Sequence, residues 1–335
     1  MPELSQPAGW LPLVFMGLMG LAMLVYVALD GYDLGVGILL GLATDGEKDT
    51  MVESIGPFWD GNETWLVLGV GLLLAGFPLA HGVILGELYL PVAAMLLGLI
   101  LRGVAVDFRV KAPAARKAWW NRVFHAGSLI AALAQGVMLG RYVTGFQGGA
   151  WAWAFAAFVG VTLAAGYTLL GACWLIMKTE GEVQRRAVSW ARRCVWLAAA
   201  GIAAISVATP LVSAYVFQKW FSFPNIVLLA PVPLMTAALF ALVAIALQHQ
   251  PRPDERWSWL PLAGTVSVFV LAFFGLAFSI FPFVIVDRMT IWQAAAAPES
   301  LRFILAGAVI VLPVMAASNA YAYWVFRGKA RELSY

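Results

Sequence analysis

The chain has 335 residues, of which 62% are hydrophobic and only 12% are charged. An ordinary soluble domain carries about 45–50% apolar and about 25% charged residues. This composition therefore excludes a soluble globular protein and indicates a protein whose solvent is lipid. The formal net charge of +3 is too small to indicate a nucleic acid as partner, and the two cysteines, Cys173 and Cys194, are too few for a disulfide scaffold.

Apolar runs of about 20 residues, the length that crosses a bilayer as a helix, occur nine times. Lipid cannot hydrogen-bond to backbone N–H and C=O groups, so a membrane span must be a helix or part of a closed barrel. The sequence lacks the alternating pattern of barrel strands. We therefore predict an all-α polytopic membrane protein, with residues 1–335 forming a single integral membrane domain. The expected helices are 11–41, 64–80, 82–101, 122–143, 151–177, 194–217, 226–247, 259–283 and 302–326. A tight turn near Phe77 and Pro78 separates the second from the third.

The basic residues predict the orientation of these helices, because cytoplasmic loops are enriched in lysine and arginine. With nine spans, all but four of the 21 lysines and arginines fall on one side of the membrane. The four exceptions are Arg141, Lys219, Arg288 and Arg302. This alternation favours an N-terminus outside the cytoplasm, which in a bacterium is the periplasm, and a C-terminus in the cytoplasm.

The first predicted helix carries two acids, Asp30 and Asp33, within the apolar run that reads Asp-Gly-Tyr-Asp-Leu-Gly-Val-Gly from Asp30. Residues three apart share a helix face, and a carboxylate inside the hydrocarbon costs a few kcal/mol. Partners must therefore come from other helices or another subunit. One interpretation is a proton-conducting or anchoring polar site, and the alternative is that both side chains reach the cytoplasmic interface.

The second chemically distinctive stretch runs from Gly56 to Trp65 and contains Asp60 and Glu63. Asp60 has the spacing of a helix N-cap, with Glu63 completing a capping box. The functional alternative is that both acids lie at the cytoplasmic depth of Asp33. They would then form one acidic cluster with it, open to the cytoplasm.

The third predicted helix contains Glu87 toward its outer end and Arg102 at its cytoplasmic end. We interpret Glu87 as a polar contact between helices. Arg102 lies nearer the membrane than the neighbouring Arg109, and we predict that it pairs with one of the buried acids. Arg109 is interpreted as an ordinary positive anchor at the cytoplasmic surface.

The three histidines argue against a cofactor held by this chain alone. Haem iron needs an axial ligand facing a bundle interior, and only His81 has a suitable depth; a turn residue is the simpler interpretation. No Cys-x-x-Cys-His motif and no histidine pair at helical spacing is present. We therefore predict no catalytic residue, no metal ligand and no haem ligand in this chain.

The stretches from Asp30 to Gly37, Pro57 to Trp65 and Arg102 to Arg109 resemble subunit II of cytochrome bd-type ubiquinol oxidases, and most closely the cyanide-insensitive branch. Leu-Tyr-Leu-Pro at Leu88 and Phe-Pro-Phe-Val at Phe281, followed by Thr-Ile-Trp at Thr290, add to the resemblance. It extends over essentially the whole chain. Glu87 departs from the pattern, so no role in the family is transferred to it.

The resemblance implies a haem-free subunit of two four-helix bundles and a peripheral helix. Its partner, subunit I, would hold two haems b and one haem d and would oxidise quinol while reducing O₂ to water. Cytoplasmic proton uptake would contribute to the membrane potential. A small single-helix accessory subunit and membrane lipid are further implied partners. The equivalents of Asp33 and Asp60, with Asp30 and Glu63, would lie on the proton route, and Trp65 near the subunit interface.

Two other functions compete with this one. A self-sufficient proton-coupled transporter would also have buried acids, but transporters usually show internal repeats and interrupted helices at mid-membrane. A purely structural scaffold would leave Asp30 and Asp33 unexplained. Recovery of a red, haem-bearing partner with the purified chain would separate the three hypotheses.

Overall fold

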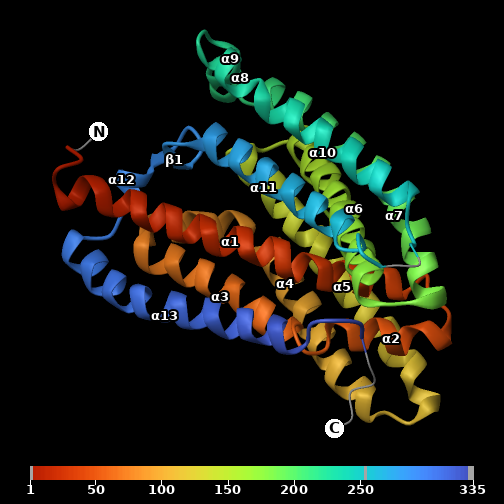
Figure 1. Ribbon diagram of the computed structural model, residues 1–335. Coiled ribbons are helices and arrows are strands. Elements are labelled where there is room, and N and C mark those ends of the chain that lie inside the picture. The colour runs from red at the N-terminus through yellow and green to blue at the C-terminus, as the bar shows by residue number, and fades with distance from the viewer. Residues whose placement is uncertain (1–2, 253–254, 331–335) are drawn as a thin grey trace.

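A computed structural model describes residues 3–252 and 255–330 and is almost entirely helical in these ranges (Figure 1). The long helices are α1 (Pro7–Leu40), α3 (Trp59–Gly76), α4 (Pro78–Lys111), α5 (Ala114–Val143), α6 (Ala150–Lys178), α7 (Gly181–Val212), α10 (Pro231–Gln248), α11 (Leu260–Ile280) and α13 (Pro298–Val325). Shorter elements are α2 (Asp45–Ile55), α8 (Ala214–Phe221), α9 (Asn225–Leu229), β1 (Phe283–Ile285), β2 (Met289–Thr290) and α12 (Ile291–Ala294).

Among the described residues, eight helices are long and apolar enough to cross a membrane. The exception among the nine long helices is α3, the counterpart of the expected span 64–80. It has 18 residues, and Asp60, Asn62 and Glu63 in its first turns lower its hydropathy. Length and apolarity therefore establish a polytopic membrane protein with eight candidate spans, and they do not confirm the nine-span count.

Most of the basic residues lie at one end of the helices, which we call the basic end. At this end, the helices extend further than the predicted apolar runs. α4 continues to Lys111 rather than ending near residue 101, and α7 begins at Gly181 rather than near residue 194. Hydropathy marks only the part of a helix that lies in lipid. Charged turns that continue a helix do not register in hydropathy, so the helices of the structure are longer than the predicted spans 82–101 and 194–217 at these ends.

Two short elements were not predicted. Helix α2 follows α1 at the basic end, and its start is fixed by Thr44 and Glu47, whose side chains and backbone satisfy each other in a capping box. The strands β1 and β2 form an antiparallel hairpin at the opposite end, within the stretch that begins at Phe281. Tyr142 of α5 donates a hydrogen bond to the carbonyl of Val284 in this hairpin.

Helix α1 is central and packs against α3, α5 and α6. The closest approach is to α6, where a Cβ atom at Gly35 would lie 1.8 Å from the carbonyl oxygen of Tyr167. Gly171 of α6 faces Gly35 with equally little space. Only hydrogen fits at either position, so the two backbones touch and hold the acidic end of α1 inside the protein.

The outer helices leave large apolar surfaces uncovered. Helix α13 lies along α1 and α3, and only 11% of its most apolar 18-residue window is buried. Helices α7 and α10 pack side by side on the far side of the molecule and are similarly exposed (Figure 1). Such surfaces are stable in lipid or against another membrane subunit.

Candidate functional site

The candidate site is a polar cluster inside the basic end of α1, α3, α4 and α13. Helix α1 places Asp30 and Asp33 on its inner face, and both residues are fully buried. The small residues of this turn, including Gly31 and Gly35, allow α6 to approach closely, which excludes water from that side. Both acids have partners on other helices, and the two sets of partners are separate.

Asp30 is paired with Arg102 of α4. The Nη1 atom of Arg102 lies 2.5 Å from Oδ1 of Asp30, and its Nη2 atom lies 2.6 Å from Oε2 of Glu63. The guanidinium also lies 6.0 Å from the centre of the Trp59 ring. One arginine, buried to 1% exposure, therefore joins α1, α3 and α4 through charge-assisted hydrogen bonds.

Asp33 is held by Asn62 rather than by a cation. The amide nitrogen of Asn62 donates to Oδ2 of Asp33 and to the hydroxyl of Tyr32, at 2.8 Å in each case. The Asn62 carbonyl accepts a hydrogen bond of 3.0 Å from Tyr323 of α13. The hydroxyls of Tyr32 and Tyr323 are bonded to each other, so the four residues form a closed network.

Aromatic rings close the inner side of this network. Tyr32 stacks on Trp174 of α6, with ring centres 4.0 Å apart, and Phe58 stacks on Tyr323 at 4.6 Å. The Lys178 ammonium caps the end of α13 by donating to the carbonyl of Phe326. These contacts fix the two tyrosine hydroxyls in one arrangement beside Asp33.

Asp60 does not join this buried cluster. Its side chain is exposed in the first turn of α3, and no hydrogen bond of the Asp60 carboxylate to Asp33 or Glu63 is present among the described residues. The predicted capping box is also wrong, because the N-cap of α3 is Phe58 and Glu63 turns inward to Arg102. The attraction of a buried guanidinium outweighs that of backbone amides in a solvated first turn.

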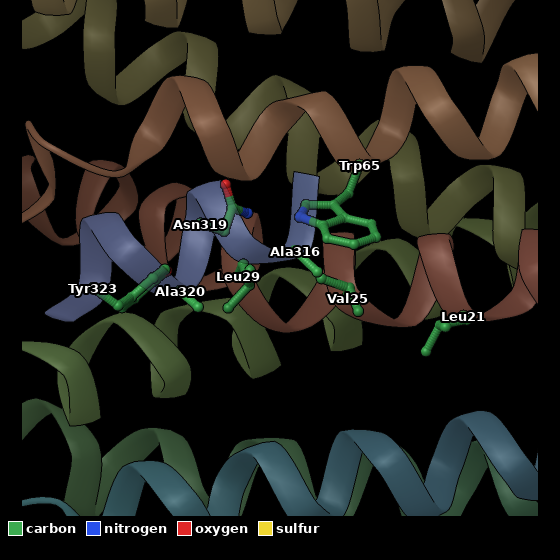
Figure 2. A pocket seen from close by; sticks show the side chains of 8 residues that line it. All are labelled: Leu21, Val25, Leu29, Trp65, Ala316, Asn319, Ala320 and Tyr323. Atoms are coloured by element: carbon green, nitrogen blue, oxygen red, sulfur yellow. The ribbon is translucent and has the colours of Figure 1, made fainter. Parts of the chain in front are cut away.

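Trp65 lines a groove between α1, α3 and α13 (Figure 2). The groove has a volume of about 440 Å³, and its wall is apolar except for the side chains of Trp65, Asn319 and Tyr323. Trp65 is only 5% exposed, and its indole nitrogen has no acceptor within the described part of the chain. Buried indole N–H groups normally have a partner.

Glu87 lies far from the cluster, at the opposite end of α4. Its carboxylate is 3.8 Å from Arg141 of α5 and 3.4 Å from Arg288 in the loop between β1 and β2. Two of the four basic residues that the loop count placed outside therefore share one partly exposed acid. Its position links helices and hairpin, as expected for a polar contact between elements.

The histidines lie on separate elements. His125 of α5 lies 2.9 Å from the carbonyl of Ile38, His249 lies 2.8 Å from the carbonyl of Ile245, and His81 lies in the first turn of α4. In residues 3–252 and 255–330, no group of three or more histidine, cysteine or acidic side chains has the arrangement of a metal site.

The sequence reasoning missed the residues that hold Asp33. Asn62 lies within the conspicuous stretch Gly56–Trp65, and Tyr32 lies between the two acids, so both were visible as neighbours of acids. Tyr323, 261 residues from Asn62 in the chain, carries no local signal. Only the packing of α13 against α3 brings it to the site.

Helix α2 covers the basic end beside this site with ion pairs. Burial would raise the pKa of Glu47, but hydrogen bonds from Thr44 and Arg186 outweigh it and lower that pKa. Burial would also raise the pKa of Asp49, but contacts with Arg109 and Lys117 outweigh it and lower that pKa. Both carboxylates are therefore charged at neutral pH, and Arg109, which is only 4% exposed, is a buried ion-pair partner of Asp49.

Fold and site together define a polytopic membrane protein with a buried ionic cluster near one face. The model of the family described as cytochrome bd terminal oxidase subunit II matches residues 11–326. The chain therefore belongs to the cytochrome bd terminal oxidase subunit II family. Membership makes it a multi-pass protein of the bacterial inner membrane and a subunit of an oxidoreductase complex, and it disfavours the transporter hypothesis.

Individual relatives agree with this assignment. Cytochrome bd ubiquinol oxidase subunit 2 of Bacillus subtilis (strain 168) is 27% identical over 321 residues, covering 89% of this chain and 90% of that protein. Cytochrome bd-I ubiquinol oxidase subunit 2 of Escherichia coli (strain K12) is 25% identical over 359 residues, with 93% of each chain covered. The bd oxidase structure from Geobacillus thermodenitrificans shares the fold, with a TM-score of 0.73 at 15% identity, covering 95% of this chain and 99% of that chain.

Proposed function

We propose that this chain is the haem-free second subunit of a quinol-oxidising bd-type terminal oxidase. In this proposal, two haems b and one haem d reside in subunit I, where quinol is oxidised and O₂ is reduced to water. The chain spans the membrane nine times, as two four-helix bundles and a peripheral helix, with its C-terminus in the cytoplasm. The names of the relatives and the distribution of basic residues support these assignments.

The observation that carries a functional role for this subunit is the charge composition of the cluster. Asp30, Asp33 and Glu63 supply three carboxyl groups around one guanidinium, that of Arg102. Two uncompensated negative charges inside a membrane protein would be expensive. The cluster is therefore best balanced when it binds protons, and a group of carboxyls that shares protons can also pass them on.

The exposure of the acids gives the proposed route a direction. Asp60 is exposed, the side chain of Glu63 is 29% exposed, and Asp30 and Asp33 are fully buried. Protons would enter past Asp60 and Glu63 and reach the buried pair. Oδ1 of Asp33 and Oδ2 of Asp30 have no donor within the described residues, so each is a position that a proton or a water can occupy.

The groove at Trp65 is the proposed contact with subunit I. It opens between α1, α3 and α13, and α13 is one of the least covered helices. A polar acceptor on a partner helix would satisfy the buried indole N–H, while the apolar wall would accept its side chains. Tyr323 lines this groove and is also hydrogen-bonded to Asn62, so the interface would share Tyr323 with the network around Asp33.

The experiment that tests the function is affinity purification of the tagged chain from its native membrane. We expect a red complex with haem b and haem d spectra, in which all haem separates with the partner when the subunits are dissociated. A colourless protein that catalyses proton-coupled solute uptake in liposomes would support the transporter hypothesis instead. Haem bound stoichiometrically to the isolated chain would refute the haem-free assignment.

A further inference from the structure

Helices α7 and α10 lie side by side, on the far side of the molecule from α3 and α13 (Figure 1). A second groove lies between them at the basic end. Its volume is about 140 Å³, and it is lined by Arg192, Val195 and Trp196 of α7 and by Ala244, Leu247 and Gln248 of α10. The lining is apolar toward the middle of the two helices, and its polar side chains, Arg192 and Gln248, lie toward the basic end. A groove of this form matches neither a proton route nor a haem pocket.

Arg192 is fixed at the mouth of this groove. Its Nε and Nη2 atoms donate to the carbonyl of Leu247 at 3.1 and 2.9 Å, and Nη2 also approaches the carbonyls of Gln248 and Gln250 at 3.2 Å. These bonds cap the last turn of α10. They leave the charge itself without a counter-ion, because within the described ranges no carboxylate lies within 4 Å of Arg192.

The other charged groups around the mouth are also mainly basic. Arg193 is exposed on the neighbouring face of α7, and Arg185, two turns away, is paired with Glu182. From the α10 side, His249 is exposed and Arg252 donates to its carbonyl. Among the described residues named here, the charged side chains around the mouth are therefore mainly basic.

Trp196 completes the arrangement. It lies one turn from Arg192 toward the middle of α7 and is 65% exposed. Tryptophan at this depth is typical of the boundary between headgroups and hydrocarbon. The groove thus offers a fixed cation at headgroup level, an interfacial indole below it and an apolar channel between two helices.

We propose that this groove binds one anionic phospholipid of the leaflet at the basic end. The lipid phosphate would lie at the exposed side of the Arg192 guanidinium, and an acyl chain would occupy the channel beside Val195, Trp196 and Leu247. Charge complementarity selects the ligand, because basic pockets between transmembrane helices attract anionic headgroups and an uncharged or zwitterionic lipid would leave Arg192 unbalanced. The proposal goes beyond the oxidase function and does not depend on it.

The test is native mass spectrometry of the purified, delipidated complex titrated with short-chain phosphatidylglycerol or phosphatidylcholine. Three variants separate the contributions. Arg192→Gln removes the fixed cation, Ala244→Leu fills the channel without changing charge, and Arg193→Gln removes the same charge from the neighbouring face. We expect wild type and Arg193→Gln to bind one phosphatidylglycerol in preference to phosphatidylcholine.

Arg192→Gln should bind it roughly fivefold more weakly, which corresponds to about 1 kcal/mol for one basic residue near an anionic lipid. Ala244→Leu should lose the bound lipid as well. Equal binding of the two lipids, unchanged binding by Ala244→Leu, or an equal loss in Arg193→Gln would each overturn the proposal. If Arg192→Gln fails to fold because α10 loses its cap, Ala244→Leu and the lipid comparison still decide the question. Oxidase activity is not a readout, so failure here leaves the proposed function untouched.

Discussion

Asp30 and Asp33 lie one helical turn apart and are both fully buried, yet asparagine should impair activity at position 33 and stability at position 30. Asp33 accepts one hydrogen bond, from Asn62, and has no cation within 4 Å in the described residues. Asn at position 33 can accept the same bond, so the change costs about 1 kcal/mol or less. We expect Asp33→Asn to assemble with normal haem content but to slow both oxygen reduction and the generation of membrane potential, because an amide cannot carry a proton.

Asp30→Asn acts on stability first. It removes one of the two carboxylates that hold the buried Arg102 guanidinium. Breaking a buried ion pair typically costs about 3–5 kcal/mol, and because Glu63 remains bonded to the guanidinium we expect the lower end, about 3 kcal/mol. The complex should therefore assemble poorly, with less haem per membrane protein.

The assay is reconstituted enzyme in liposomes, with oxygen uptake and membrane potential followed together and haem content as the measure of assembly. Asp60→Asn is the matched surface variant, because Asp60 is exposed and caps nothing, so its stability should change by no more than about 0.5 kcal/mol. A slower rate in that variant would then report proton entry. If assembled Asp33→Asn enzyme equals wild type in both readouts, Asp33 is only an anchor and the protons travel through subunit I.

The remaining predictions concern topology, packing and charge. A reporter fused to the C-terminus should be active in the cytoplasm, and activity only in the periplasm would refute the nine-span arrangement. Glu87→Gln should leave turnover largely intact, because the ion pairs of this acid in the described part of the chain are with Arg141 of α5 and Arg288 of the β1–β2 loop, far from the cluster. An assembled variant without turnover would place Glu87 in the mechanism. Gly35→Ala should destabilise the protein by at least about 1–3 kcal/mol through overlap with α6, whereas Gly71→Ala, with open space around its Cβ, should be neutral in thermal unfolding in detergent. The ion pair of Asp49 with Arg109 should stabilise the protein fully above the unfolded-state pKa of the acid, and this stability should be lost as the pH falls through the lowered folded-state pKa. Acid unfolding below about pH 4 should therefore depend less on pH in Asp49→Asn than in wild type.

The spans could be predicted because lipid imposes one simple rule, that a helix must expose about 20 apolar residues. That rule fails where a helix obeys a different constraint. The first turns of helix α3 carry Asp60, Asn62 and Glu63, so the helix as a whole is too polar to count as a span by length and apolarity. The turns of α4 after residue 101 carry Arg102, Asp107, Arg109 and Lys111, so hydropathy does not extend the predicted span over them, although the helix continues to Lys111.

The site could be predicted in part, because a buried charge requires a partner and partners are few in an apolar chain. The sequence predicts that Arg102 pairs with one of the buried acids, and the structure places it on Asp30 and Glu63. Charge does not determine the neighbours of Asp33. A neutral amide and two phenols are common residue types, and their convergence depends on how α13 packs against α1 and α3.

This difference in partners suggests why two acids one turn apart are both present. A carboxylate bonded to a buried guanidinium can be removed only at high cost, because its loss leaves the cation short of a partner. A carboxylate held by an amide and near two hydroxyls can exist with or without a proton, because Asn62 and the paired Tyr32 and Tyr323 can each adjust as donor or acceptor. Asp30 is thus suited to hold the helices together, and Asp33 to exchange protons, within the same turn of α1.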